Sequence, residues 1–211
     1  AFLGGADVSL TDVDNDVVII AGGSAESRMG ALTFVNSGPL EIGTINPAGI
    51  YSSGDVRIET LVGDLTLSQN INTTSTSSTA IVLNAGKSAE AGSAAGGNIV
   101  VSGTPTITVG AGGRATLYTG SISESHGLST VVGQQSGRYR YNADEQTDFT
   151  TTAWTSLGSG VYGVFREQPQ LTLTAGAQNV KYGELPQLTY SASGLKLFDT
   201  AADAISGQPL L

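Results

Sequence analysis

The stretch GDVRIETLVGDLTL, residues 54–67, contains two copies of one short phrase: Gly-Asp, then three residues of which the first and third are apolar. Alternating apolar residues are typical of a short β-strand with one buried face, and the Gly-Asp pair supplies the turn before it. This repetition predicts many short strands of one design. Related phrases occur along the first half of the chain: DVSL (7–10), DVVI (16–19), ALTF (31–34), AIVL (80–83), GNIVV (97–101) and TITV (106–109).

The spacing of these phrases is regular. The first apolar residues of successive repeats are Val8, Leu32, Val56 and Ile81, which gives a nearly constant period. In each repeat a second phrase begins shortly after the first, and a weaker third segment lies near Ile50 and Ile71. Three short strands per repeat predict an all-β fold, a parallel β-helix solenoid in which the repeats are stacked. A β-sandwich is the alternative, but it does not require a fixed period.

Composition and charge exclude several classes of function. Charged residues make up 13% of the chain, against about 25% in an ordinary domain. The net charge of −9 argues against binding to nucleic acid or anionic lipid, which requires clustered Lys and Arg. The absence of cysteine excludes disulfides and thiolate metal sites. No apolar run is long enough for membrane insertion.

Changes in composition and periodicity divide the chain into three predicted parts: β-helix repeats over 1–135, a cap or linker over 136–168, and the start of a second β-rich module over 169–211. Two low-complexity inserts, 68–79 and 86–97, interrupt the repeats. We expect 86–97 to form a loop at one corner, either a binding loop or a flexible connection. The aromatic residues of 136–168 suit a cap over the last repeat, with an aromatic sugar-binding platform as the alternative.

Two sets of residues resemble a known family. The phrases GDVRI, GDLTL and GNIVV resemble the haemagglutinin-type repeats of large bacterial exoproteins, the two-partner-secreted adhesins that include filamentous haemagglutinin. The segments RYRYNADE (138–145) and YGVFREQP (162–169) resemble the region of these proteins that comes after the repeats. The segment KYGELPQLTYSASGL (181–195) is similar to the opening of the YGX-type MBG module, with Tyr182-Gly183 as its signature pair.

The resemblance implies a right-handed β-helix from a secreted adhesin at the bacterial cell surface, exported through an outer-membrane secretion partner. It implies no catalytic residue and no cofactor. The expected partners are a glycan, a polysaccharide of the biofilm matrix or a host surface receptor. Because a strand phrase begins close to Ala1, we also expect further repeats before it in a longer parent chain.

Candidate chemistry is sparse. Asp12, Asp14 and Asp16 offer oxygen ligands at alternate positions and form the one candidate calcium site, although the EF-hand pattern fails and acidic turn residues are the simpler interpretation. His126, the single histidine, lies near no nucleophile motif.

The sequence leaves three functions open. The favoured one is a non-enzymatic stalk or adhesive segment that attaches to a host surface or biofilm matrix. The second is a passive spacer for a distant tip. The third is a β-helical polysaccharide-degrading enzyme, which would need carboxylates clustered with Arg or Lys on one face. Between Leu61 and Arg114 the chain has few charged residues, which argues against such a cluster in the middle of the repeats.

Overall fold

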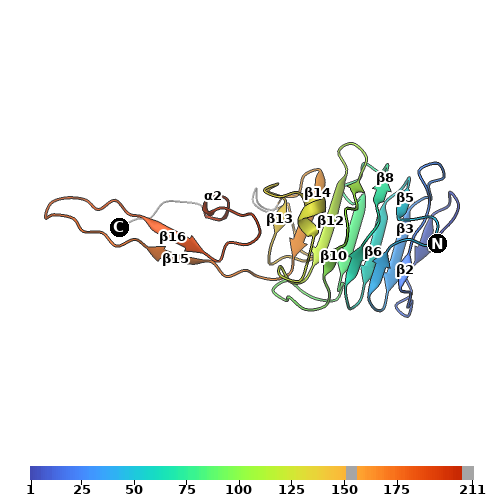
Figure 1. The fold of residues 1–211 in the computed structure, drawn as a ribbon, viewed down its shortest axis with the longest axis horizontal. Helices are drawn as coiled ribbons and strands as arrows, with labels where there is room; N and C mark the ends of the chain where they lie inside the picture. The colour runs from blue at the N-terminus through green and yellow to red at the C-terminus, as the bar shows by residue number, and fades with distance from the viewer. Residues whose placement is uncertain (151–155, 206–211) are drawn as a thin grey trace. The chain divides into compact units, whose positions relative to one another are not determined.

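The computed structural model describes residues 1–150 and 156–205, which form two compact units, Ala1–Gln168 and Pro169–Leu211. Short β-strands dominate the first unit, with a short helix between β12 and β13 (Figure 1). The elements of the first unit are β1 (Val8–Leu10), β2 (Ile19–Ile20), β3 (Leu32–Asn36), β4 (Leu40–Ile42), β5 (Ile50–Ser52), β6 (Val56–Thr60), β7 (Leu65–Leu67), β8 (Ile71–Thr73), β9 (Ile81–Ala85), β10 (Ile99–Val101), β11 (Ile107–Thr108), β12 (Arg114–Thr119), α1 (Leu128–Val132), β13 (Tyr139–Arg140) and β14 (Gly160–Phe165).

The described strands of the first unit pair in parallel and form three sheets. Their orders are β1-β3-β6-β9-β12-β14-β13, β10-β7-β4-β2 and β11-β8-β5. From β3 to β12 the chain visits the three sheets in turn, because each strand of a sheet is followed by one strand in each of the other two. The prediction of an all-β fold with parallel strands is confirmed, and a β-sandwich, whose sheets are antiparallel, does not fit.

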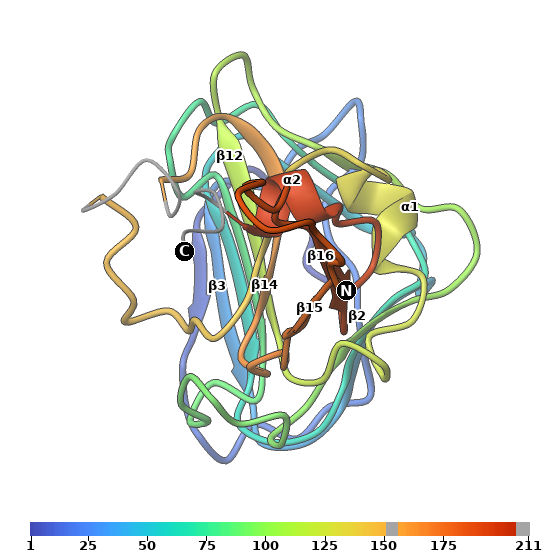
Figure 2. The ribbon, with the colours of Figure 1, turned by 90° about the vertical axis from the view of Figure 1, so that its left-hand side faces the viewer.

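The register of the long sheet reproduces the period of the sequence. Leu32 pairs with Val8 on one side and with Val56 on the other, and Val56 pairs with Ile81. Side chains of one parity therefore point inward in rows, and those of the other parity point outward. In Figure 2 the strands of the first unit surround one interior. The central inward row, each member at most 2% exposed, consists of Phe34, Ile58, Leu83 and Leu117.

Insertions lengthen the later repeats without breaking the sheet. Ala115 of β12 pairs with Ile81 before it and with Val161 after it, and both steps along the chain are longer than the period of the earlier repeats. Residues 86–97 form a loop between β9 and β10, as predicted. The weaker third segment predicted near Ile50 and Ile71 is confirmed as β5 and β8, which pair with each other. Residues 68–79 therefore contain a strand of the repeat and are not an insert throughout.

Helix α1 is a feature that the sequence pattern does not predict. It contains five residues, too few for a periodic signal. Its buried side chains are Leu128 and Val132, so it presents an apolar side to the interior of the first unit.

Two strands within 136–168, β13 and β14, extend the long sheet, so this part of the chain is more than the predicted cap or linker. Strand β14 follows β12 in the sheet, and the two-residue β13 forms the edge beyond it. Aromatic rings pack beneath this edge. The ring centroid of Phe165 is 5.6 Å from that of Tyr141 and 6.2 Å from that of Tyr139. A very short edge strand backed by packed rings leaves little backbone open to pairing.

One corner of the repeats is held by a buried amide. Asn36, at the end of β3, is fully buried, and its Nδ2 donates to the carbonyls of Val17 and Gly38, both at 3.0 Å. Its Oδ1 accepts from the backbone N–H of Val17 at 2.9 Å. The next strand of the row ends in Thr60, whose hydroxyl donates to the carbonyl of Gly63 at 2.8 Å. Polar side chains at the strand ends thus satisfy backbone groups that the turns leave unpaired.

The second unit contains β15 (Thr172–Ala175), β16 (Tyr190–Ser193) and α2 (Ala201–Ala204). β15 and β16 pair in antiparallel fashion, and every residue of β15 is exposed. Tyr182 and Leu185 are also exposed, so within the described residues 169–205 this pair of strands has no buried apolar core.

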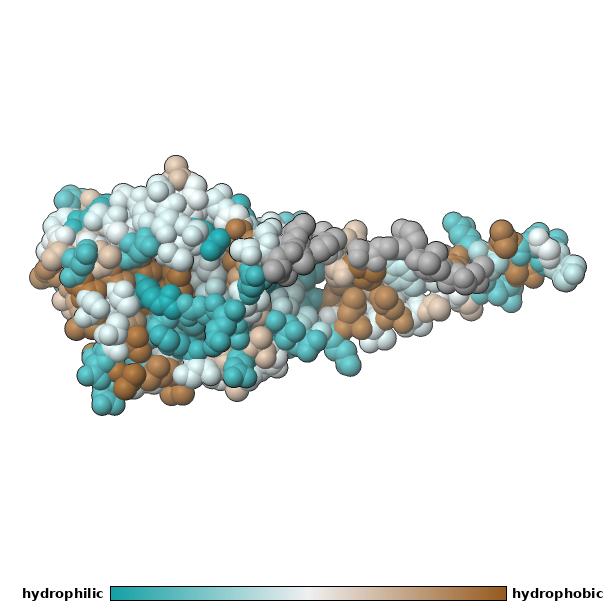
Figure 3. Space-filling model, turned by 180° about the vertical axis from the view of Figure 1, so that it is seen from behind, coloured by the Kyte–Doolittle hydropathy of each residue, from teal (hydrophilic) through white to brown (hydrophobic). Residues whose placement is uncertain are grey.

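The surface of the first unit is mixed in character. Figure 3 shows hydrophobic residues scattered among hydrophilic ones, with a group of hydrophilic residues in the middle of the face that it presents. Within residues 1–150 and 156–205, no helix has the length and apolar character needed to cross a membrane.

Leu83→Ala tests the inward row. Leu83 is fully buried between Ile58 and Leu117, so we expect the free energy of unfolding to fall by about 2–5 kcal/mol in urea denaturation. Thr66→Ala, an outward position on β7, is the control and should cost less than about 0.5 kcal/mol. Similar losses for the two variants would contradict the assignment of faces.

Candidate functional site

The floor of the candidate site is a row of outward side chains across neighbouring strands of the long sheet. Glu59 of β6 pairs with Asn84 of β9, and Asn84 pairs with Tyr118 of β12. Adjacent strands are about 4.8 Å apart, so three residues that are distant in the sequence become direct neighbours. Arg57 lies two residues before Glu59 on β6 and therefore points to the same face.

Charged groups converge at this row. Glu59 is 1% exposed and forms ion pairs with Arg57, at 2.5 Å, and with Lys87. Arg57 also pairs with Glu145, whose second oxygen accepts from Nδ2 of Asn84 at 3.0 Å. Burial disfavours the charge of Arg57, but its hydrogen bond to Glu145 and the charge of Glu59 outweigh it, so the pKa of Arg57 is raised. A buried carboxylate is tolerated here because two cations compensate it.

The loop 86–97 forms one wall, and Arg166 binds the backbone of this loop. Arg166 follows β14 and is 1% exposed. Its Nη2 donates to the carbonyls of Gly97, at 2.8 Å, and Ala95, at 3.2 Å. Burial lowers the pKa of Arg166, and the charge of Asp144 partly opposes this. The guanidinium thus binds the loop by its backbone, independently of the loop's side chains.

Residues 142–147 form the opposite wall. Ala143 packs with Val82, Tyr118 and Val164 in an apolar cluster on the outer face of the long sheet. Next to it, the carboxylate of Asp144 accepts from the backbone N–H of Ala91 at 2.9 Å, which ties the two walls together. Burial raises the pKa of Asp144, but hydrogen bonds from Ala91, Thr147 and the backbone outweigh it, and the net pKa is lowered.

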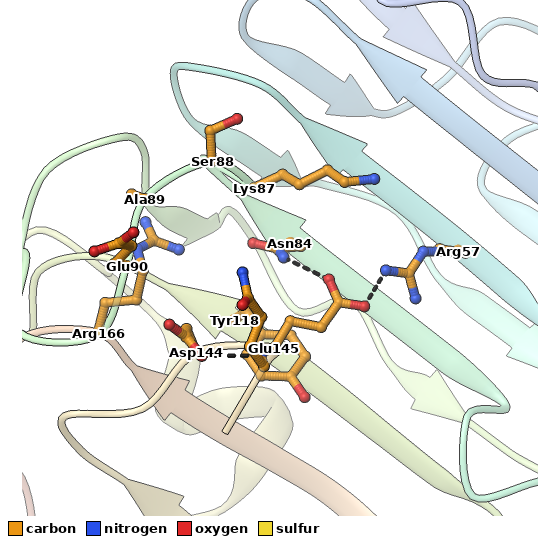
Figure 4. A pocket seen from close by; sticks show the side chains of 11 residues that line it. Arg57, Asn84, Lys87, Ser88, Ala89, Glu90, Tyr118, Asp144, Glu145 and Arg166 are labelled. Atoms are coloured by element: carbon orange, nitrogen blue, oxygen red, sulfur yellow. Dashed lines mark hydrogen bonds and ion pairs between the residues drawn. The ribbon is translucent and has the colours of Figure 1, made fainter. Parts of the chain in front are cut away.

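Between these walls lies a pocket of about 420 Å³. Figure 4 shows Glu145 between Asn84 and Arg57, with Lys87 above them and Arg166 and Glu90 on the far side. Burial and the nearby charge of Glu145 raise the pKa of Tyr118 to about 12, so its hydroxyl keeps its proton well into the alkaline range. The volume is within the range of small-molecule sites, about 300–1,000 Å³.

The residues singled out for calcium lie elsewhere. Asp12, Asp14 and Asp16 are exposed in the turn between β1 and β2, where Asp12 Oδ1 accepts from the backbone N–H of Asp14 at 3.0 Å. In the part of the chain that the structure describes, no three His, Cys, Asp or Glu residues are grouped so that they could hold a metal ion. Calcium binding there stays a sequence-based prediction without support from the geometry. His126 is exposed in a loop.

Sequence reasoning misses the pocket for a physical reason. The stretch between Leu61 and Arg114 is indeed poor in charge, but residues 142–147, from a later part of the chain, lie against the outer face of the long sheet. They supply Asp144 and Glu145 to the lining, and Arg166 follows β14. The repeat period could have predicted one contact of the site. Glu59 and Asn84 lie one repeat apart in the sequence, and they pair in the sheet.

Comparison with known proteins adds no relative: no family model matches the chain, and no curated protein or solved structure is significantly similar to it.

Arg57→Met tests the charge network. The variant keeps much of the side-chain stem but leaves Glu59 with the partly exposed Lys87 as its cation, so we expect a loss of about 3 kcal/mol in the free energy of unfolding. Lys87→Met, the matched control, leaves Arg57 bound to both carboxylates and should cost less than about 1 kcal/mol. If both variants lose the same free energy of unfolding in chemical denaturation, Arg57 is not the main cation that compensates Glu59.

The Tyr118 environment predicts a pH dependence. Its pKa is about 12 in the folded protein against 10 unfolded, so folding favours the protonated phenol. The resulting stability is complete below about pH 10 and is lost as the pH rises toward about 12. We expect Tyr118→Phe to flatten the decline of the free energy of unfolding over this window. An unchanged decline, measured by urea denaturation at each pH, would show that Tyr118 titrates normally.

Proposed function

We propose that the first unit is a right-handed parallel β-helix from a secreted bacterial surface adhesin and serves as a non-enzymatic stalk or adhesive segment. The observation that carries this proposal is the order in which the chain visits three parallel sheets, with each strand of the long sheet paired to its counterpart one repeat away. Such a chain grows by adding repeats along one axis, a geometry suited to reach and display. The right-handed sense follows from the rule for parallel crossovers.

The parent protein, in this proposal, leaves the cell through an outer-membrane secretion partner. Residues 169–211 then belong to the opening of an MBG-like module. The surface partner is a glycan, a biofilm polysaccharide or a host receptor. Support comes from the ordered phrases of the sequence and from its low share of charged residues, 13%, which favours hydrogen bonding over charge attraction.

The pocket favours a second candidate, polysaccharide degradation. It brings Glu90, Asp144 and Glu145 beside Arg57 and Lys87, the kind of cluster that such an enzyme needs. Two features weigh against it. The carboxylate of Glu145 is bound to Arg57 and Asn84, and the pKa of Asp144 is lowered, whereas a general acid needs a raised one.

An array of immobilised matrix polysaccharides and host-cell glycans, with and without calcium, tests the proposal. We expect saturable retention of the folded protein and no new reducing ends in the bound polysaccharide. Retention that requires calcium would place contact at Asp12, Asp14 and Asp16, and the triple Asp→Asn variant would then lose it. A blank array on folded protein would leave the passive spacer, and new reducing ends would establish the enzyme.

A further inference from the structure

Two charged residues of the lining, Arg166 and Asp144, hold the walls of the pocket in place. Arg166 is bound to the carbonyls of Ala95 and Gly97, and Asp144 to the N–H of Ala91. These contacts fix the loop 86–97 against the segment 142–147 before any ligand arrives. A site whose walls are fixed in advance avoids part of the ordering cost of binding.

The floor of the pocket contains a polar atom without a partner. Asn84 is 3% exposed, and its Oδ1 is buried and receives no hydrogen bond from any described residue. The hydrogen bond to Glu145 fixes the orientation of the Asn84 amide. A carboxylate oxygen can only accept, so the amide atom that faces Glu145 Oε2 must be Nδ2, and the atom without a partner is Oδ1. Figure 4 shows the amide oxygen turned away from Glu145 within the lining. A buried acceptor left unpaired destabilises the folded protein, so a ligand group that donates to this atom would remove that cost.

The charges of the lining restrict the class of ligand. Arg57, Lys87 and Arg166 are matched by Glu90, Asp144 and Glu145, and Glu59 beneath them adds one more negative charge. The two cations on the open side, Arg57 and Lys87, already face carboxylates. A sulfate or carboxylate ligand would have to displace those partners. A neutral molecule rich in hydroxyl groups meets no such competition, since each hydroxyl both donates and accepts.

We propose that this pocket binds one neutral sugar unit of a glycan, with a ligand hydroxyl donating to Asn84 Oδ1. The inference rests on the proposed adhesive function and deepens it by naming the site and the ligand class. Glu145 accepts from the sugar on one side of the amide, and the protonated Tyr118 borders the floor. Binding at this row would place the glycan against the side of the stacked strands.

Saturation-transfer NMR on the full chain tests this with glucose, galactose and N-acetylglucosamine as neutral probes and glucuronate as the charged one. We expect transfer to at least one neutral sugar and a weaker signal for glucuronate. Asn84→Leu should weaken neutral-sugar binding at least about tenfold. Asn72→Leu is the matched control, because Asn72 points outward on a different sheet, and it should leave binding unchanged.

If Asn84→Leu fails to fold, Ser88→Trp provides a second test, since Ser88 is an exposed part of the lining and a tryptophan there would fill the opening. Loss of the sugar signal in a folded variant supports the site. Absence of any neutral-sugar signal, equal binding of glucuronate, or binding retained in the folded variants would overturn it. Retention on the polysaccharide array without sugar binding in the pocket would overturn this inference alone and leave the adhesive function standing.

Discussion

The parallel register between neighbouring repeats is the constraint on which the other features of the first unit depend. Backbone hydrogen bonds hold β6 beside β9 so that Ile58 meets Leu83 inside while Glu59 meets Asn84 outside. The inward row stabilises the fold by burying apolar surface, about 1.5–3 kcal/mol for each large side chain. The outward row is a by-product of the same register, and it sets a buried carboxylate next to an amide. A slip by one residue would exchange the two faces and remove both features.

Insertions are tolerated because this register is local. A loop between β9 and β10 or a segment before β14 lengthens the repeat without altering the hydrogen bonds between neighbouring strands. Such insertions are also the source of the site. Residues 142–147 lie on the outer face, held by Ala143 against Val82 and Val164, and they add Asp144 and Glu145 to the lining. The central inward row therefore comes from the repeats alone, whereas the site combines outward side chains of the repeats with an irregular segment.

Much of the fold is predictable from the sequence. The phrases around Leu32, Val56 and Ile81 have a nearly constant period that favours stacked, in-register strands over a β-sandwich, and strands lie at each of them. The pocket is less predictable. Pairing of Glu59 with Asn84 follows from one period, but the step to Tyr118 is lengthened by the loop 86–97. The place of Glu145 depends on tertiary packing of residues far along the chain, and no periodic pattern encodes that.

Cross-linking by engineered cysteines tests the register most directly, because the natural chain has none. Thr66 of β7 pairs with Val100 of β10 on the outward face, across the loop 86–97. Their Cα atoms should be about 4.8 Å apart, within the range for a disulfide, whereas Thr66 and Ser102 should be about 8 Å apart, beyond it. Thr66→Cys with Val100→Cys is therefore expected to cross-link on mild oxidation, and Thr66→Cys with Ser102→Cys to remain reduced. Cross-linking of the second pair in place of the first would contradict the register and the site built on it.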